Sequence, residues 1–271
     1  MTRRPRAPLA PLCAGLMAAA LLAACATTTS STGRRQNVGA VSQAELDQLG
    51  AQAFAEAKQK QPLSQDPKQT TYVRCVVNAL VAQLPASERG IAWETAVFQD
   101  NEANAFALPG GKVGVNTGIF TVAKTQDQLA AVVAHEIGHV VEHHFDERIT
   151  NQVRTSQALA ILGALAGDYG QLVTEGGGLA ANTGFLLPNS RRQESEADVV
   201  GQRLMAQAGF DPRQAVNLWQ NMLAAGGARP PQWLSTHPDP QARIRELSTR
   251  ADTLVPDYEA ARAAGRKPRC G

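Results

Sequence analysis

The sequence has 271 residues, of which 26 are Lys or Arg and 24 are Asp or Glu, so its formal charge at neutral pH is +2. Hydrophobic residues make up 44% of the chain, which is enough for a folded domain with a proper core. The near balance of charge excludes a protein that binds nucleic acid through a strongly basic surface.

The amino terminus has the pattern of an export signal. Arg3, Arg4 and Arg6 precede an apolar run from Leu9 to Ala24. This run is shorter than the about 20 residues that a membrane-spanning helix needs. Residues 1–24 are therefore predicted to be a cleaved signal peptide, with an uncleaved anchor as the alternative.

The end of this segment, Leu22-Ala23-Ala24-Cys25, resembles the signal of bacterial lipoproteins. The resemblance implies that Cys25 carries lipid and that the mature chain is anchored to a membrane. An Asp directly after the lipidated Cys usually retains lipoproteins at the inner membrane, but here Ala26 follows Cys25. We therefore expect the protein to be anchored at the periplasmic face of the outer membrane. Loss of three arginines with the signal leaves 23 basic and 24 acidic residues, and no binding of nucleic acid is expected.

Residues 25–41 are rich in Thr and Ser and are predicted to be a flexible tether. The folded domain, residues 42–271, is predicted to begin with a helix over 43–60 that has Ser42 as its N-cap. The next predicted elements are a helix over 67–83 and a strand over 92–98.

Residues 104–108 and 112–116 are predicted to be paired strands, because extended patterns flank the turn residues Pro109-Gly110-Gly111. An edge strand of this kind can hold an extended peptide through main-chain hydrogen bonds, largely independently of its sequence. An ordinary hairpin in the core is the alternative. The residues that would contact such a peptide are Asn104, Ala105 and Phe106.

A short helix from Thr117 is predicted to precede a longer one from about residue 126, which carries His135-Glu136-Ile137-Gly138-His139. His135 and His139 lie on one face of this helix, about 6 Å apart along its axis, so both can bind one zinc ion. Glu136 lies beside the open position of the metal, where a carboxylate can take a proton from zinc-bound water. Gly138, unfavourable in a helix interior, indicates that another segment approaches closely. Two histidines packed in a core helix are the alternative.

One zinc ion per chain needs a third ligand. His143 and His144 are predicted to lie at the end of the helix, where positive charge is favourable to its dipole. Further along, Glu194 and Asp198 share one face of a predicted helix. Glu194 can be the third ligand while Asp198 fixes the tautomer of a ligand His. Acidic residues that merely compensate the helix dipole are the alternative.

With these residues the chain resembles the zinc metallopeptidase family of the CAAX prenyl protease and the β-barrel assembly-enhancing protease. The resemblance covers residues 67 to 250. It rests on the His-Glu-x-x-His pattern, on a Glu-x-x-Ala-Asp segment at 194–198, and on Asn104 to Gly111 ahead of the zinc helix. It implies proteolysis, with Glu194 as third zinc ligand. We expect a lipoprotein subgroup without a helical-repeat domain.

Ser235-Thr236-His237-Pro238, with Arg243 six residues after the His, is similar to a late His-Pro segment of that family. Either His237 or Arg243 can donate to the oxyanion that develops during attack on a carbonyl. The resemblance also allows His237 to occupy the fourth zinc position in a resting enzyme, and this is the hypothesis that we favour. A plain loop His is the remaining alternative.

The last predicted helices cover 191–208, 212–225 and 240–252. Helices, a small sheet and further helices predict one α+β domain of the zincin type, mostly helical with a small sheet and an edge strand. Cys13 leaves with the signal and Cys25 carries lipid, so Cys75 and Cys270 remain as a possible disulfide in an oxidising compartment.

The leading functional hypothesis is a zinc-dependent endopeptidase of the cell envelope that cleaves misfolded or unassembled envelope proteins. The alternative is a chaperone or scaffold lipoprotein in which zinc only stabilises the fold and unfolded chains are bound without cleavage. A peptide deformylase, which shares the His-Glu-x-x-His pattern, is disfavoured because neither Cys75 nor Cys270 lies where its Cys ligand would be. The sequence carries no signal for the oligomeric state.

Overall fold

The computed structural model describes residues 26–165, 190–225, 233–234, 237 and 239–271. The predicted signal peptide, the lipidation site Cys25, and Ser235, Thr236 and Pro238 lie outside these residues.

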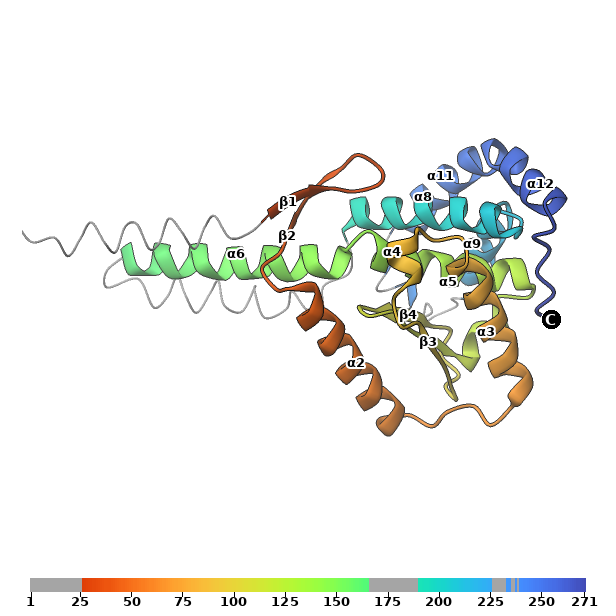
Figure 1. The fold of residues 1–271 in the computed structure, drawn as a ribbon, viewed down its shortest axis with the longest axis horizontal. Helices are drawn as coiled ribbons and strands as arrows, with labels where there is room; N and C mark the ends of the chain where they lie inside the picture. The colour runs from red at the N-terminus through yellow and green to blue at the C-terminus, as the bar shows by residue number, and fades with distance from the viewer. Residues whose placement is uncertain (1–25, 166–189, 226–232, 235–236, 238) are drawn as a thin grey trace, which may run out of the picture.

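The described elements agree with the predicted α+β class (Figure 1). The strands are β1 (Ala26–Thr29), β2 (Arg35–Val38), β3 (Glu94–Phe98), β4 (Ala105–Leu108) and β5 (Lys112–Asn116). The first helices are α2 (Gln43–Lys60), α3 (Pro67–Val81), α4 (Ala86–Arg89), the 3₁₀ helix η1 (Thr117–Thr121) and α5 (Gln126–Val141). The later helices are α6 (His144–Leu165), α8 (Arg191–Ala208), α9 (Gln214–Ala225), α11 (Pro240–Thr253) and α12 (Val255–Ala263). Helices α4 and α12 were not predicted from the sequence.

Helix α2 begins where the sequence predicts. Ser42 accepts a hydrogen bond from the backbone N–H of Glu45, and the Glu45 side chain accepts one from the backbone of Ser42. Leu46 and Phe54 form the buried face of the helix, while most of its other side chains are at least partly exposed. The predicted cap is confirmed.

The sheet contains β3, β5 and β4 in that order, with β5 parallel to β3 and antiparallel to β4. The chain turns between β4 and β5 at Gly110 and Gly111, whose φ angles of 73° and 71° are strained for other residues. Among the described strands, β4 pairs only with β5, so it is an edge strand as predicted.

Helix α5 is the centre of the molecule. It lies between α8 on one side and the sheet on the other, and it also packs against α3 and α9 (Figure 1). Every residue from Gln128 to His139 is buried. Burial on all sides explains the apolar sequence around the two histidines, and it holds their backbone rigidly.

Two glycines allow α5 and α8 to approach each other. A Cβ atom on Gly138 would lie 3.0 Å from the carbonyl oxygen of Ala197, and one on Gly201 would lie 3.0 Å from the backbone nitrogen of His135. The close approach predicted from Gly138 is therefore confirmed, and the approaching segment is α8.

The predicted flexible tether over 25–41 is wrong for the described part of that range. Strands β1 and β2 form an antiparallel hairpin that packs against α6 (Figure 1). Thr residues favour strands, and the polar side chains of this segment bind buried carboxylates of the domain. Composition alone predicted a linker, because composition does not show which groups these side chains bind in the folded domain.

Cys75 of α3 and Cys270 form a disulfide, with their Cα atoms 5.4 Å apart, so this predicted pair is confirmed. Nearby, the side chain of Gln126 bonds to the backbone of Pro268 and of Cys270. The tail is thereby fixed to α3 and to the first residue of α5.

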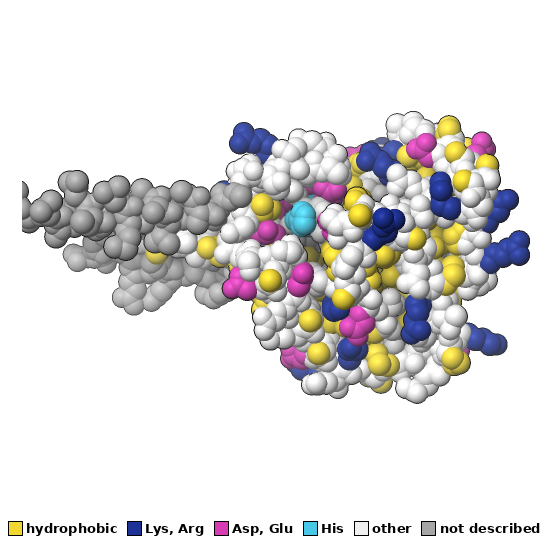
Figure 2. Space-filling view, in the orientation of Figure 1, with side chains coloured by type: hydrophobic (Ala, Val, Ile, Leu, Met, Phe, Trp, Pro, Cys, Tyr) yellow, Lys and Arg dark blue, Asp and Glu magenta, His cyan; other side chains and the backbone are white. Residues whose placement is uncertain are grey.

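None of the helices in the described ranges combines the length and apolar character that a membrane crossing requires. The face shown in Figure 2 carries basic and acidic side chains together with exposed hydrophobic ones.

Candidate metal centre

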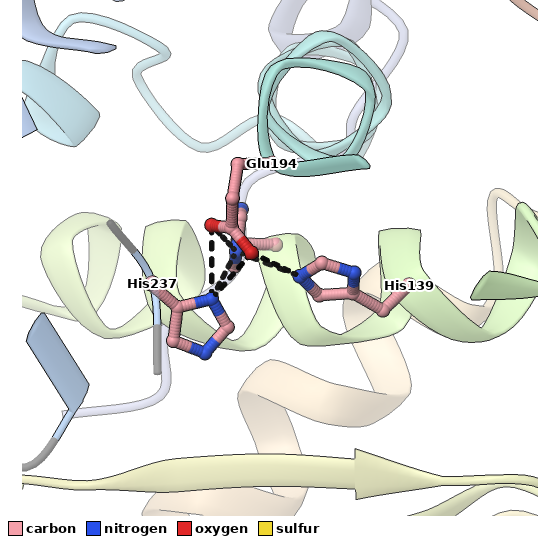
Figure 3. Close-up of side chains that lie close together, drawn as sticks. His139, Glu194 and His237 are labelled. Atoms are coloured by element: carbon pink, nitrogen blue, oxygen red, sulfur yellow. Dashed lines mark hydrogen bonds and ion pairs between the residues drawn. The ribbon is translucent and has the colours of Figure 1, made fainter. Parts of the chain in front are cut away.

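Four buried side chains from three parts of the chain converge between α5 and α8. His135 and His139 project from α5, Glu194 from the first turn of α8, and His237 from the segment that follows α9. Figure 3 shows His139, Glu194 and His237 pointing toward one another. Ser190 caps α8 through a capping box with Gln193, which fixes the turn that carries Glu194. None of the four is more than 5% exposed.

The atoms that face one another lie at short distances. The Nε2 atoms of His135 and His139 are 3.0 Å apart, and Nε2 of His135 is 3.2 Å from Nδ1 of His237. Glu194 places Oε2 at 2.9 Å from Nδ1 of His237 and at 3.4 Å from Nε2 of His135. Its Oε1 lies 3.4 Å from Nε2 of His139.

These distances fit a tetrahedral zinc site. Ligand atoms about 2.0–2.1 Å from a zinc ion at the corners of a tetrahedron are about 3.3 Å from one another. The separations of 2.9 to 3.4 Å between these atoms are close to that value, and one ligand atom from each of the four residues lies within 4.8 Å of the others. Imidazole nitrogens and a carboxylate are also the donors that zinc prefers.

The environment of His139 and of Glu194 favours the charge states that bind a metal. Burial lowers the pKa of His139 well below its usual value, so this imidazole is neutral. Burial opposes ionisation of Glu194, but the charge of His237 and hydrogen bonds from the three histidines hold the pKa of that carboxyl well below its usual value.

His135 differs from His139 in its protonation. Burial and the charge of Arg243 disfavour the charged imidazole, but hydrogen bonds to Asp198 and Glu194 prevail and raise the pKa of His135 to about 9. A proton and a metal ion therefore compete for this residue.

Glu136 lies beside the four side chains. Its Oε1 accepts a hydrogen bond of 2.7 Å from Nε1 of Trp233 and is 3.3 Å from Nε2 of His237. The carboxylate is therefore within reach of a molecule bound at the cluster, as its position after the first His predicts. Its role as general base stays a prediction.

Asp198 and Arg243 hold the ring of His135 in place. Asp198 Oδ1 lies 3.0 Å from Nδ1 of His135, the contact that the sequence predicts for it. Arg243 donates to both oxygens of Asp198, at 2.6 and 2.7 Å, and also to Glu194, and its guanidinium lies over the ring of Trp219. This geometry favours a positioning role for Arg243. The predicted contact with an oxyanion stays untested.

The prediction that His144, together with His143, is a cation at the end of the zinc-binding helix is wrong. The chain turns at His143, where φ is 53°, and α6 begins at His144. His144 is fully buried, with Nδ1 at 2.7 Å from Nδ1 of His139 and Nε2 at 3.1 Å from Glu196. Burial lowers its pKa although Glu196 opposes this, so the ring is neutral and is no helix-terminal cation.

A sequence signal for this contact existed. Glu196 is the middle acid of Glu194-Ser195-Glu196-Ala197-Asp198, and it lies on the opposite side of α8 from Glu194 and Asp198. In the structure this side chain is 3% exposed, which is consistent with a specific partner on that side of the helix.

The predicted substrate strand lies alongside α5, with Ala105 buried and Asn104 partly buried. The ring of Phe106 stacks on Phe98 and packs edge-on against Phe54, with ring centres 5.9 and 6.3 Å apart. A side-chain contact between Phe106 and a substrate is therefore not supported, because the ring belongs to a hydrophobic cluster. Its backbone faces β5, because Phe106 pairs with Gly114 two residues along from the hydrogen bond between Asn116 N and Asn104 O. The outward main-chain groups of β4 therefore belong to Ala105 and Ala107.

Comparison with known proteins agrees with this geometry. A family profile described as Peptidase family M48 matches residues 67–251. The mitochondrial metalloendopeptidase OMA1 of Schizosaccharomyces pombe is 42% identical over 180 residues, which cover 66% of this chain and 52% of that protein. The β-barrel assembly-enhancing protease of Escherichia coli K12 is 31% identical over 218 residues, 77% of this chain and 44% of that protein. OMA1 of Saccharomyces cerevisiae is 35% identical over 172 residues, 59% of this chain and 47% of that protein. The chain thus matches about half the length of these relatives.

Proposed function

The chain belongs to peptidase family M48, and from this premise we propose that it is a zinc-dependent endopeptidase that cleaves misfolded or unassembled proteins of the cell envelope. One observation carries the proposal. The ligand atoms of His135, His139 and Glu194 converge at tetrahedral spacing, and the carboxylate of Glu136 lies beside them.

The chemistry divides between the ion and the side chains. A zinc ion held by His135, His139 and Glu194 would acidify a water molecule and polarise the carbonyl of a peptide bond. Glu136 takes the proton as the water attacks the carbonyl carbon and then gives it to the leaving amine. The indole N–H of Trp233 holds Oε1 of Glu136 in place between these two transfers.

The edge strand supports a polypeptide substrate. Strand β4 runs along α5, and a peptide that adds to its outer edge would be held by main-chain hydrogen bonds near the site. Such binding requires an extended chain and no particular sequence. Unfolded or unassembled proteins meet that requirement, whereas folded ones do not.

The position of His237 supports a resting state. A catalytic zinc site keeps one position open, and His237 Nδ1 lies within 3.2 Å of ligand atoms from His135 and Glu194, where it could take that position. We propose that His237 binds the zinc at rest and withdraws when a substrate enters.

The proposed location rests on the amino terminus. Cys25 as a lipid anchor and the periplasmic face of the outer membrane follow from the sequence pattern, and both concern residues outside the described ranges. One relative is named for β-barrel assembly, which supports the envelope, while others are named as mitochondrial enzymes.

The decisive comparison is between the purified protein and Glu136→Gln, which keeps the shape of the side chain but cannot accept the proton. Both are expected to bind one zinc ion per chain, whereas casein cleavage by the variant falls by about 100-fold or more. If neither protein cleaves but both prevent aggregation of an unfolded protein equally, the chaperone alternative is correct. Equal cleavage by both would remove Glu136 from the mechanism.

A further inference from the structure

The hairpin of β1 and β2 is bonded to the outer side of the metal centre. Arg34, in the turn of this hairpin, donates two hydrogen bonds to Glu147 of α6, at 2.6 and 2.8 Å. Its Nε donates to Oε2 of Glu196 in α8 at 2.7 Å, and Thr32 donates to the other oxygen of Glu196. One guanidinium thus ties two helices together.

A second set of contacts continues from Glu196 into the site. Oε2 of Glu196 is 3.1 Å from Nε2 of His144, and Nδ1 of His144 is 2.7 Å from Nδ1 of His139. The opposite nitrogen of His139, Nε2, is one of the four converging ligand atoms. All three side chains are at most 3% exposed, so water does not compete for these bonds.

The direction of each hydrogen bond follows from the ligand role of His139. Its Nε2 must be unprotonated to bind a metal, so the neutral ring carries its proton on Nδ1 and donates it to Nδ1 of His144. Because that nitrogen of His144 accepts, its Nε2 carries the proton and donates to Glu196. The tautomer of each ring is therefore fixed from outside by an ionised Glu196.

The other histidine of α5 has an equivalent support. Asp198 lies against Nδ1 of His135, and Arg243 holds Asp198. Arg34 holds Glu196 as Arg243 holds Asp198. Arg34 lies outside residues 67–251, which match the family profile. The partner that completes the second support comes from a segment that the profile does not cover.

We propose that His144 and Glu196 are positioning residues for the metal ligand His139, and that Arg34 of the hairpin holds them in place. The proposal rests on the proposed function, because it takes His139 as a ligand. Carboxylates and other groups behind a ligand His orient its ring and raise its basicity, and their loss typically weakens metal binding by about 10–100-fold.

The test measures the zinc affinity of the full chain by competition with a chelator, together with the melting temperature of the zinc-free protein. His144→Leu removes both hydrogen bonds and is expected to weaken zinc binding by about 10–100-fold. His144→Gln keeps one acceptor and one donor and is expected to restore most of the affinity. Arg34→Gln is expected to weaken zinc binding by about tenfold.

Asn37→Ala is the matched control, because it removes a contact of the same hairpin, with Asn151 of α6, that does not lead to the metal centre. Its zinc affinity is expected to equal that of the wild type. If Arg34→Gln does not fold, Arg34→Lys is the second variant. It keeps the positive charge but cannot make the bidentate hydrogen bonds of a guanidinium, so we expect an intermediate loss of zinc affinity.

The outcomes separate this inference from the proposed function. Unchanged zinc affinity in His144→Leu and Arg34→Gln overturns the inference and leaves the endopeptidase proposal intact. An equal loss in His144→Gln and His144→Leu also overturns it, because the imidazole would then matter only for packing. A wild-type chain that binds no zinc refutes the proposed function itself, and with it the ligand role on which the inference depends.

Discussion

Three acidic side chains within five residues of α8 have three different partners. Glu194 faces the converging histidines, Asp198 faces Nδ1 of His135 and the guanidinium of Arg243, and Glu196 faces His144 and Arg34. A helix directs residues two positions apart to opposite sides, so the outer two acids share the metal face and the middle one does not. Spacing alone predicts the first two roles, while the role of Glu196 depends on a turn at His143.

At the residue scale, His237→Ala is expected to increase casein cleavage, because removal of the imidazole opens the fourth position around the zinc. If His237 occupies the zinc in about nine of ten molecules, only about one in ten is active, so removing the imidazole would increase cleavage about tenfold. Initial rates at saturating zinc measure the effect.

The control for that increase is the double variant His237→Ala with Glu136→Gln, which is expected to be inactive and so to assign the cleavage to this site. A decrease in cleavage by His237→Ala would contradict the resting-ligand hypothesis and favour donation to the oxyanion instead.

At the scale of elements, the metal centre depends on how closely α5 and α8 pack. Gly138 and Gly201 allow that approach, and each leaves no room for a larger side chain without a shift of backbone. Because α8 carries Glu194 and α5 carries the two histidines, a shift between the helices changes the distances among the ligand atoms. Helix packing and metal binding are therefore coupled.

Gly138→Val is expected to destabilise the zinc-free protein by about 1–3 kcal/mol, since the added side chain meets the backbone of Ala197. Urea unfolding followed by circular dichroism measures the change. The matched control is Gly90→Val at the exposed end of α4, where a Cβ makes only ordinary contacts at 3.5 Å. A loss in Gly138→Val no larger than in Gly90→Val would show that the packing is not tight.

At the scale of the whole molecule, the disulfide connects residues separated by 195 positions in sequence. It fixes the carboxy-terminal tail to α3, while Gln126 fixes the same tail to the start of α5. Cross-linking so long a stretch of chain restricts the unfolded state strongly.

Replacement of both Cys75 and Cys270 by Ser is therefore expected to lower the free energy of unfolding by about 2–5 kcal/mol. Urea unfolding of the two forms measures this difference. Zinc affinity is expected to change little, because neither Cys is among the four residues whose ligand atoms converge. Equal stability of the two forms would contradict the prediction.

The sequence by itself determined the elements and the ligands that lie close together along the chain. Periodicity and capping residues predicted α2, α8 and the start of α5 to within a residue or two, since those signals are local. The spacing of His135 and His139 required only the pitch of a helix. The family resemblance, carried by short motifs, was confirmed for residues 67–251.

Only the tertiary structure decided how distant segments meet. Residues 26–38 read as a tether because their Thr and Ser find partners only in the folded domain, and His144 reached His139 only because the chain reverses at His143. The convergence of His237 with Glu194 likewise depends on packing between helices. Local patterns specify which groups are available, whereas the distances that let four of them share one ion arise from the packing of the whole core.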